Sequence, residues 1–162
     1  TNDEGKENLF AGRCDVYTTD ASGLSSTRAA ASDPDKWLVL PEIISKEPLG
    51  PLVRHGDHQW GDVVRWSLNA MIIAEELGVS SENVDAQLGS NVPEVLRLLG
   101  VEGSYGEMLE LAPDWAYQII KQIGNYSESY EANVGPDTPL EIARGLNALW
   151  TQGGILYAPP FR

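Results

Sequence analysis

An α/β fold class is predicted for this chain, because strand-like segments are confined to its first third and helical patterns fill the remainder. Residues 13–19 are rich in β-forming side chains, which alternate between the two faces of a strand. A helical stretch follows them, so the sequence predicts a strand–turn–helix unit. Residues 36–44 are an apolar run of strand length, interrupted at Pro41, and Leu52–Arg54 is a third short strand. Three short strands cannot bury both faces of a sheet, so they are expected to belong to a larger α/β body.

The composition is that of one soluble globular body with an acidic surface. The 162 residues include 24 acidic and 11 basic side chains, which give a net charge of −13, and 42% of the residues are hydrophobic. Nucleic acids and anionic membrane surfaces bind to basic patches, so neither is expected as a partner. The longest apolar-rich run, near Leu68–Ala74, is far shorter than the roughly 20 residues of a membrane span. The polar start without methionine is typical of a processed or truncated chain.

Helical periodicity and stop signals predict seven helices. Gly12 is suited to a left-handed cap that ends the first of them, and Gly124 is expected to kink the sixth. Thr138, followed three residues later by Glu141, has the pattern of a capping box at the start of the last helix. The expected ranges are 4–11, 21–31, 58–77, 80–88, 91–99, 113–134 and 138–152.

Asp20 stands where the first strand meets the following helix, and two roles are open for it. Its side chain can cap the helix by accepting hydrogen bonds from the first N–H groups. In open α/β sheets, however, ligands bind outside the carboxyl ends of strands, and Asp20 directly follows a predicted strand. A carboxylate there, flanked by the Thr18 and Thr19 hydroxyls, suits the ammonium group of a ligand. The two roles can coexist, because two oxygens accept several hydrogen bonds.

Other residues with reactive or ligating side chains are assigned no site. His55 and His58 flank Gly56 without a third ligand nearby, so exposed turn histidines are expected rather than a metal site. Cys14 has no partner for an internal disulfide and no neighbouring His to activate it. Asn125 matches a glycosylation acceptor, but the pattern is common and this segment is predicted to be helical. No metal, cofactor or catalytic group is therefore predicted.

Four long stretches carry a family resemblance: AGRCDVYTTDASGL, LPEIISKEPLGPLVRHGDHQW, DWAYQIIKQIGNY and ARGLNALWTQGGILYAPPFR. They closely resemble the general L-amino-acid-binding periplasmic proteins of ABC transporters, which are type II solute-binding proteins. The resemblance extends from about Glu7 to Arg162. It implies a protein with two α/β lobes joined by crossover strands, which closes on an amino acid and delivers it to a membrane permease without performing chemistry. A periplasmic location is implied as well.

The resemblance covers only the C-terminal half of that fold, because the family's first half has no counterpart here. Residues 1–48 would be the end of the second lobe, 49–56 the hinge or crossover, and 57–162 a helical segment of lobe one. The arginine that grips the ligand carboxylate in this family belongs to the absent half. This chain alone is therefore expected to bind ligand weakly.

The resemblance also suggests roles for individual residues. Asp20 matches the acid that binds the ligand's α-ammonium in this family, and Thr19 and Thr18 are the neighbouring ligand-binding candidates. A second cysteine can lie in the absent part of lobe two, which would leave Cys14 without its partner.

Two other functions remain open beside amino-acid binding, which we favour. An enzyme of the cyclohexadienyl dehydratase type would use the same fold, but it needs a general acid in the cleft and only Asp20 is available. A helical protein-interaction module would bind a partner through the acidic residues 55–162. Unpaired strand edges and an uncovered apolar surface also predict oligomerisation, or reassociation with the missing N-terminal half.

Overall fold

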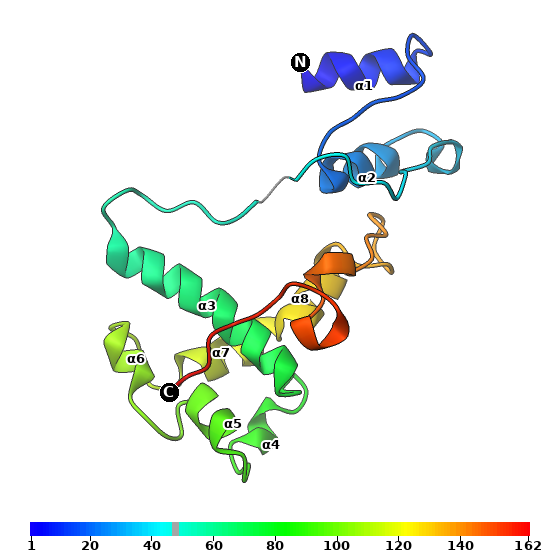
Figure 1. Ribbon diagram of the computed structural model, residues 1–162. Helices are drawn as coiled ribbons and strands as arrows, with labels where there is room; N and C mark the ends of the chain where they lie inside the picture. The colour runs from blue at the N-terminus through cyan, green and yellow to red at the C-terminus, as the bar shows by residue number, and fades with distance from the viewer. Residues whose placement is uncertain (47–48) are drawn as a thin grey trace. The chain divides into compact units, whose positions relative to one another are not determined.

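The structure, a computed structural model, describes residues 1–46 and 49–162 (Figure 1). Its internal contacts divide the chain into two compact units. Unit 1 comprises Thr1–Leu49 and Val134–Ala143, and unit 2 comprises Gly50–Asn133 and Arg144–Arg162. Unit 1 is thus built from two segments far apart in sequence. The predicted end of the first domain, at residue 48, lies outside the described residues.

Unit 1 contains two helices in the places that the sequence predicts. Helix α1 spans Asn2–Phe10 and α2 spans Ala21–Ala29, followed by a short 3-10 turn, η1, at Pro34–Lys36. Gly12 follows α1 with φ 68°, which confirms the left-handed residue expected there. No hydrophobic side chain is buried among the described residues of unit 1. This unit therefore lacks an apolar core of its own.

The predicted strands are wrong as paired elements of this chain. Residues 13–20, 37–46 and 52–54 are extended or bent, and none of them pairs with another described segment. Among the described residues there is one isolated parallel bridge, between Leu149 and Leu156. A strand is stabilised by hydrogen bonds to a neighbouring strand, and none of the residues that the structure describes lies paired beside these segments. Their apolar side chains consequently face solvent, as Ile44 does with 80% of its surface exposed.

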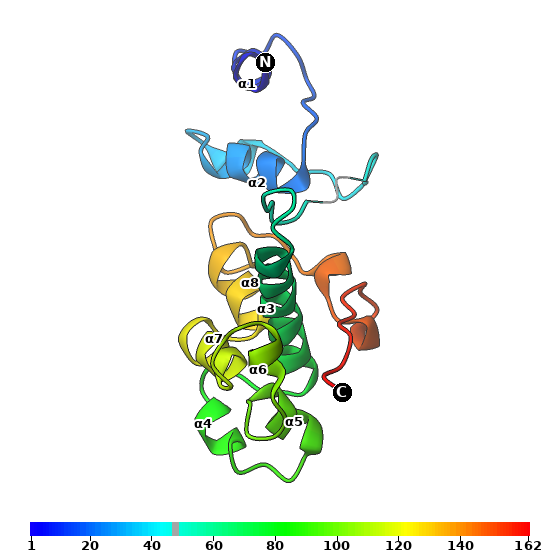
Figure 2. The same cartoon turned by 90° about the vertical axis from the view of Figure 1, so that its left-hand side faces the viewer.

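Unit 2 is a helical body centred on one long helix, α3. This helix begins after Asp57, whose side chain accepts a hydrogen bond from the Trp60 N–H at 3.1 Å, and it packs against α5, α7 and α8. Both views show α7 and α8 alongside α3 (Figures 1 and 2). The helices are α3 (His58–Glu76), α4 (Val84–Gln87), α5 (Pro93–Leu98), α6 (Tyr105–Met108), α7 (Trp115–Ile123) and α8 (Tyr126–Asn133).

The hydrophobic core lies entirely in unit 2. Its members come from α3, α5, α7, the connections between them and the C-terminal segment, and Leu98 and Ile120 have only 2% and 0% of their surface exposed. Trp60 and Trp150 lie outside this core and are about half exposed. The buried residues are Ala70, Ile72, Ile73, Ala74, Val79, Val84, Val95, Leu98, Leu99, Leu109, Trp115, Ala116, Ile120, Leu149, Ala158 and Phe161.

Two helix predictions need correction. The kink expected at Gly124 is a full break between α7 and α8, because Gly124 adopts φ 96° and ψ −177°, a conformation outside any helix. The last predicted helix, 138–152, does not form. Glu141 has φ 51°, and the segment contains only the 3-10 turns η2 (Gly145–Asn147) and η3 (Trp150–Gln152). The capping box is absent as well, because the Thr138 hydroxyl accepts from the Leu140 N–H, whereas the Glu141 N–H donates to the Thr138 main-chain carbonyl.

Candidate functional site

Asp20 lies at the junction between the extended residues 13–20 and the first turn of α2, as the N-cap residue. Its main-chain carbonyl accepts the first helical hydrogen bond, from the Leu24 N–H at 2.8 Å. Its carboxylate, however, accepts no capping hydrogen bond from α2, so the side-chain capping role predicted from the sequence is wrong for this structure. Asp20 is half-buried, and its carboxylate makes no hydrogen bond or ion pair within the described part of the chain.

The two threonines before Asp20 differ in exposure. Thr19 is half-buried, and its methyl group lies so close to α2 that a Cβ added to Gly23 would stand 3.2 Å from it. Thr18 is exposed. Gly23 thus allows the extended segment to approach the first turn of the helix. The helix itself is braced there by the Thr27 hydroxyl, which donates to the Gly23 carbonyl at 2.7 Å.

This junction offers one group that can bind a positive charge on a small ligand and other groups that can bind a negative charge. The unpaired Asp20 carboxylate is a suitable acceptor for an ammonium group. The first-turn N–H groups of α2 have no side-chain acceptor, and the N-terminus of a helix attracts negative charge.

The remaining candidate residues do not form sites. His55 and His58 are exposed, and no group of three potential metal ligands occurs in residues 1–46 and 49–162. Cys14 is a free, half-buried thiol. Asn125 is buried, with 7% of its surface exposed, and its side-chain amide donates to the Val79 carbonyl at 2.9 Å. A buried, hydrogen-bonded amide is unavailable for glycosylation.

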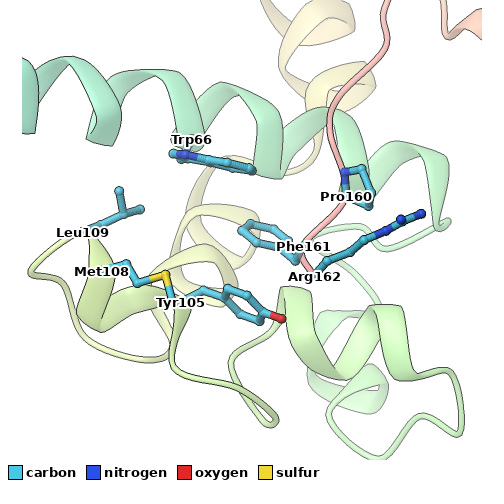
Figure 3. A pocket seen from close by; sticks show the side chains of 7 residues that line it. All are labelled: Trp66, Tyr105, Met108, Leu109, Pro160, Phe161 and Arg162. Carbon is cyan, nitrogen blue, oxygen red and sulfur yellow. The ribbon is translucent and has the colours of Figure 1, made fainter.

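A separate cavity of about 270 Å³ lies in unit 2, where the C-terminal segment meets α3 and α6 (Figure 3). The Phe161 ring stacks on Trp66 with 5.2 Å between ring centroids. The lining contains no Asp or Glu side chain and none of the residues predicted to bind ligand; it consists of Trp66, Tyr105, Met108, Leu109, Pro160, Phe161 and Arg162. Sequence reasoning missed this cavity, because its walls come from three separate parts of the chain.

An ionic cluster on the surface of unit 2 is structural. The Lys121 ammonium and the Tyr117 hydroxyl both donate to the Asp85 carboxylate, and these two hydrogen bonds lower the pKa of Asp85. The hydrogen bond to Asp85 in turn raises the pKa of Lys121. The cluster joins α4 to α7 at an exposed position.

Comparisons with known proteins show what this chain is similar to. The glutamate/glutamine/aspartate/asparagine-binding protein BztA of Rhodobacter capsulatus is 54% identical over 98% of this chain and 47% of its own length. The general L-amino acid-binding periplasmic protein AapJ of Rhizobium johnstonii is 56% identical over 94% of this chain and 45% of its own length. No protein-family model matches the chain. The chain thus spans about half the length of these curated relatives.

A solved structure is similar over the whole of this chain. It is described as an ABC transporter / periplasmic binding protein from Brucella ovis with glutathione bound, and it is 49% identical with a TM-score of 0.93. The match covers 100% of this chain and 51% of that protein. It confirms the predicted fold class as half of a periplasmic-binding-protein fold, although the described residues contain almost no strand. The chain is therefore similar over nearly its whole length to amino-acid ABC transporter binding proteins, and it corresponds to their C-terminal half.

Proposed function

We propose that this chain supplies the ammonium-binding part of an amino-acid-binding protein, with Asp20 as the anchor and Thr19 and Thr18 as neighbouring hydrogen-bonding groups. The observation that carries the proposal is the half-buried Asp20 carboxylate, which has no hydrogen bond or ion pair among the described residues. A carboxylate taken partly out of water is stabilised when a cation pairs with it. An α-ammonium group supplies that cation.

The ligand class follows from what the relatives' ligands have in common. BztA is named for glutamate, glutamine, aspartate and asparagine, and the Brucella ovis structure contains glutathione. Glutathione begins with a γ-linked glutamyl residue, so it presents the same free α-ammonium and α-carboxylate as glutamate. We infer that the site recognises this α-amino-acid head group and accepts side chains of different lengths. Delivery to an ABC permease in the periplasm is part of the same proposal, and the chain acts in it as a binding protein rather than as an enzyme.

The test is ligand binding by a chimera in which the N-terminal half of the Brucella ovis relative precedes this chain. Isothermal titration with L-glutamate, L-glutamine and glutathione measures the affinity of the chimera and of this chain alone. We expect Asp20→Asn to weaken binding by about 100-fold or more, because it removes the charge-assisted pair with the ammonium. The chain alone is expected to bind far more weakly than the chimera.

Asp15→Asn is the matched control, because Asp15 is an exposed acid in the same extended segment and makes no side-chain hydrogen bond among the described residues. It removes the same charge and should leave the affinity unchanged. Circular dichroism and thermal melting establish that both variants fold as the parent does. Equal affinity of the Asp20→Asn variant and the parent would show that Asp20 has no part in binding.

A further inference from the structure

The cavity between α3, α6 and the C-terminal segment has an aromatic floor, made by Phe161, Trp66 and Tyr105, and an exposed rim. Phe161 is buried, with 8% of its surface exposed, and its ring centroid lies 5.2 Å from that of Trp66 and 5.4 Å from that of Tyr105. Met108, at the end of α6, has 76% of its surface exposed. Figure 3 shows Met108 and Leu109 across the hollow from Trp66. A side chain from outside this chain can therefore reach the aromatic floor.

The size and the walls of the cavity suit one large apolar side chain. A cavity of about 150 Å³ already admits benzene, and this one has a volume of about 270 Å³. Its walls combine aromatic rings with the Met108 thioether, which makes favourable contacts with the edge of an aromatic ring. An aromatic or long aliphatic side chain is the expected occupant, because burying it removes apolar surface from water.

The α6 side of this rim is acidic. Residues 101–110 contain no Lys, Arg or His but three acids, which are Glu102, Glu107 and Glu110. All three acids are exposed, and none makes a side-chain hydrogen bond or ion pair within the part of the chain that the structure describes. Glu107 directly precedes Met108, and Glu110 directly follows Leu109, so both acids adjoin residues that line the cavity. Their charges are available to a cationic partner.

The C-terminal wall does not neutralise these acids. Arg162 is the single basic residue among those that line the cavity. Its side chain extends away from Met108 and Leu109 (Figure 3), and it makes no ion pair with another described residue. The chain as a whole carries a net charge of −13, which adds to the attraction that a cationic segment experiences. The cavity therefore combines an apolar interior with a negatively charged rim.

We propose that this cavity is a docking site for a basic segment of a partner protein. One aromatic or long aliphatic side chain of the segment enters the cavity, and flanking Lys or Arg side chains pair with Glu107 and Glu110. The buried anchor supplies most of the affinity, as central residues do at other interfaces. The pairs at the rim speed association and select against acidic partners. The site lies wholly in unit 2 and does not involve Asp20, so it is tested apart from amino-acid binding.

The probe is the capped peptide Lys-Lys-Phe-Lys-Lys, whose binding to this chain is measured by titration calorimetry at low ionic strength. Replacing its Phe by Gly should weaken binding about tenfold, because the anchor is lost. The Glu107→Gln, Glu110→Gln double variant should weaken binding by about fivefold to twentyfold. The Glu82→Gln, Glu131→Gln double variant is the matched control. It removes the same charge from exposed acids of unit 2 that make no side-chain hydrogen bond among the described residues.

Hydrogen exchange locates the bound peptide, which should slow amide exchange in residues 105–109, and thermal melting checks that both double variants fold as the parent does. Equal affinities for the Phe and Gly peptides would show that the cavity takes no anchor. Equal losses in the two double variants would reduce the attraction to the net charge of the chain, and either result would overturn the proposal. The chimera should bind the peptide as this chain does. Loss of binding there would show that the N-terminal half covers the cavity, which would overturn docking of a separate partner.

Discussion

The Glu128 carboxylate is hydrogen-bonded to Ser81, which lies 47 residues earlier in the chain. The Ser81 N–H donates to both carboxylate oxygens at 3.1 Å, and the Ser81 hydroxyl donates to Oε1 at 2.5 Å. The Asn125 N–H adds a further hydrogen bond at 2.8 Å. One acid thus ties the turn that follows α3 to the start of α8. Burial by itself would raise the pKa of Glu128, but the bonds from Ser81 and Asn125 outweigh it and lower this pKa below 4.5.

The stability of unit 2 should depend on the ionisation of Glu128. Because its pKa is lower in the folded state, its stabilising contribution is fully present above about pH 4.5 and is lost as pH falls through the folded pKa. We expect Glu128→Gln to reduce the free energy of unfolding at pH 7 by about 1–2 kcal/mol. Urea titrations followed by tryptophan fluorescence at pH 7 and pH 3.5 measure both effects. The variant should differ less from the parent at the lower pH, and an equal difference at both would contradict the assignment.

Removal of the Arg144 side chain should destabilise unit 2 strongly. Arg144→Ala leaves the nearly buried Glu75 carboxylate unpaired and takes the cation from the two tyrosine rings. We expect a loss of about 2–4 kcal/mol in the free energy of unfolding. Arg65→Ala, which breaks an exposed pair with Asp62, is the control and should cost no more than about 0.5 kcal/mol. Similar losses in the two variants would mean that the Glu75–Arg144 pair is no stronger than a surface pair.

An alanine at position 124 should be poorly tolerated. Gly124 combines φ 96° with ψ −177°, and an added Cβ would stand 2.8 Å from Glu128 Cβ. We expect Gly124→Ala to cost about 2–4 kcal/mol, although alanine favours helices. Gly78→Ala is the comparison, because Gly78 has φ 67° with open space around it and should lose only about 1 kcal/mol. Thermal melting of both variants checks the order, which a stabilising Gly124→Ala would reverse.

Truncation of a side chain in the hydrophobic core should destabilise unit 2, and Leu98, which is 2% exposed, is the residue to test. Leu98→Ala should lower the free energy of unfolding by about 3 kcal/mol, because it removes buried methyl groups and leaves a cavity. Leu52→Ala is the matched control: Leu52 is 98% exposed, and its truncation should change stability by less than about 0.5 kcal/mol. Urea unfolding of this chain measures both, and equal effects would contradict the assignment of the core to the helical body.

The sequence predicts correctly those helices whose ends are determined by nearby residues. Helix α3 begins at the Asp57 cap and ends before Gly78, as the sequence predicts, because cap and periodicity both lie within the helix or next to it. The capping-box pattern at Thr138 failed for a different reason. Its hydroxyl accepts from the Leu140 N–H rather than from Glu141, and Glu141 adopts a left-handed φ of 51° while its carboxylate pairs with Arg28. That partner lies 113 residues away, where no local pattern records it.

The strand segments and the candidate site likewise combine features that nearby residues predict with features that depend on distant parts of the protein. Residues 13–19 have β-forming side chains, but a strand needs a neighbouring strand, and the described residues provide none. The position of Asp20 before α2 was predictable from the adjoining helix pattern. Its missing side-chain cap was not, because the rotamer of an N-cap residue depends on groups that the sequence does not place.

Unit 1 is built from two separate segments, and this affects what happens to the chain when a protease cuts it once. Residues 37–46 are extended and mostly exposed, so a protease would cleave there first. The N-terminal product would carry α2, whereas Val134–Ala143 would remain on the C-terminal product. Since unit 1 draws on both, the two products should elute together from a sizing column and separate only in denaturant. A cut backbone would then leave a non-covalent heterodimer, held in part by one ion pair.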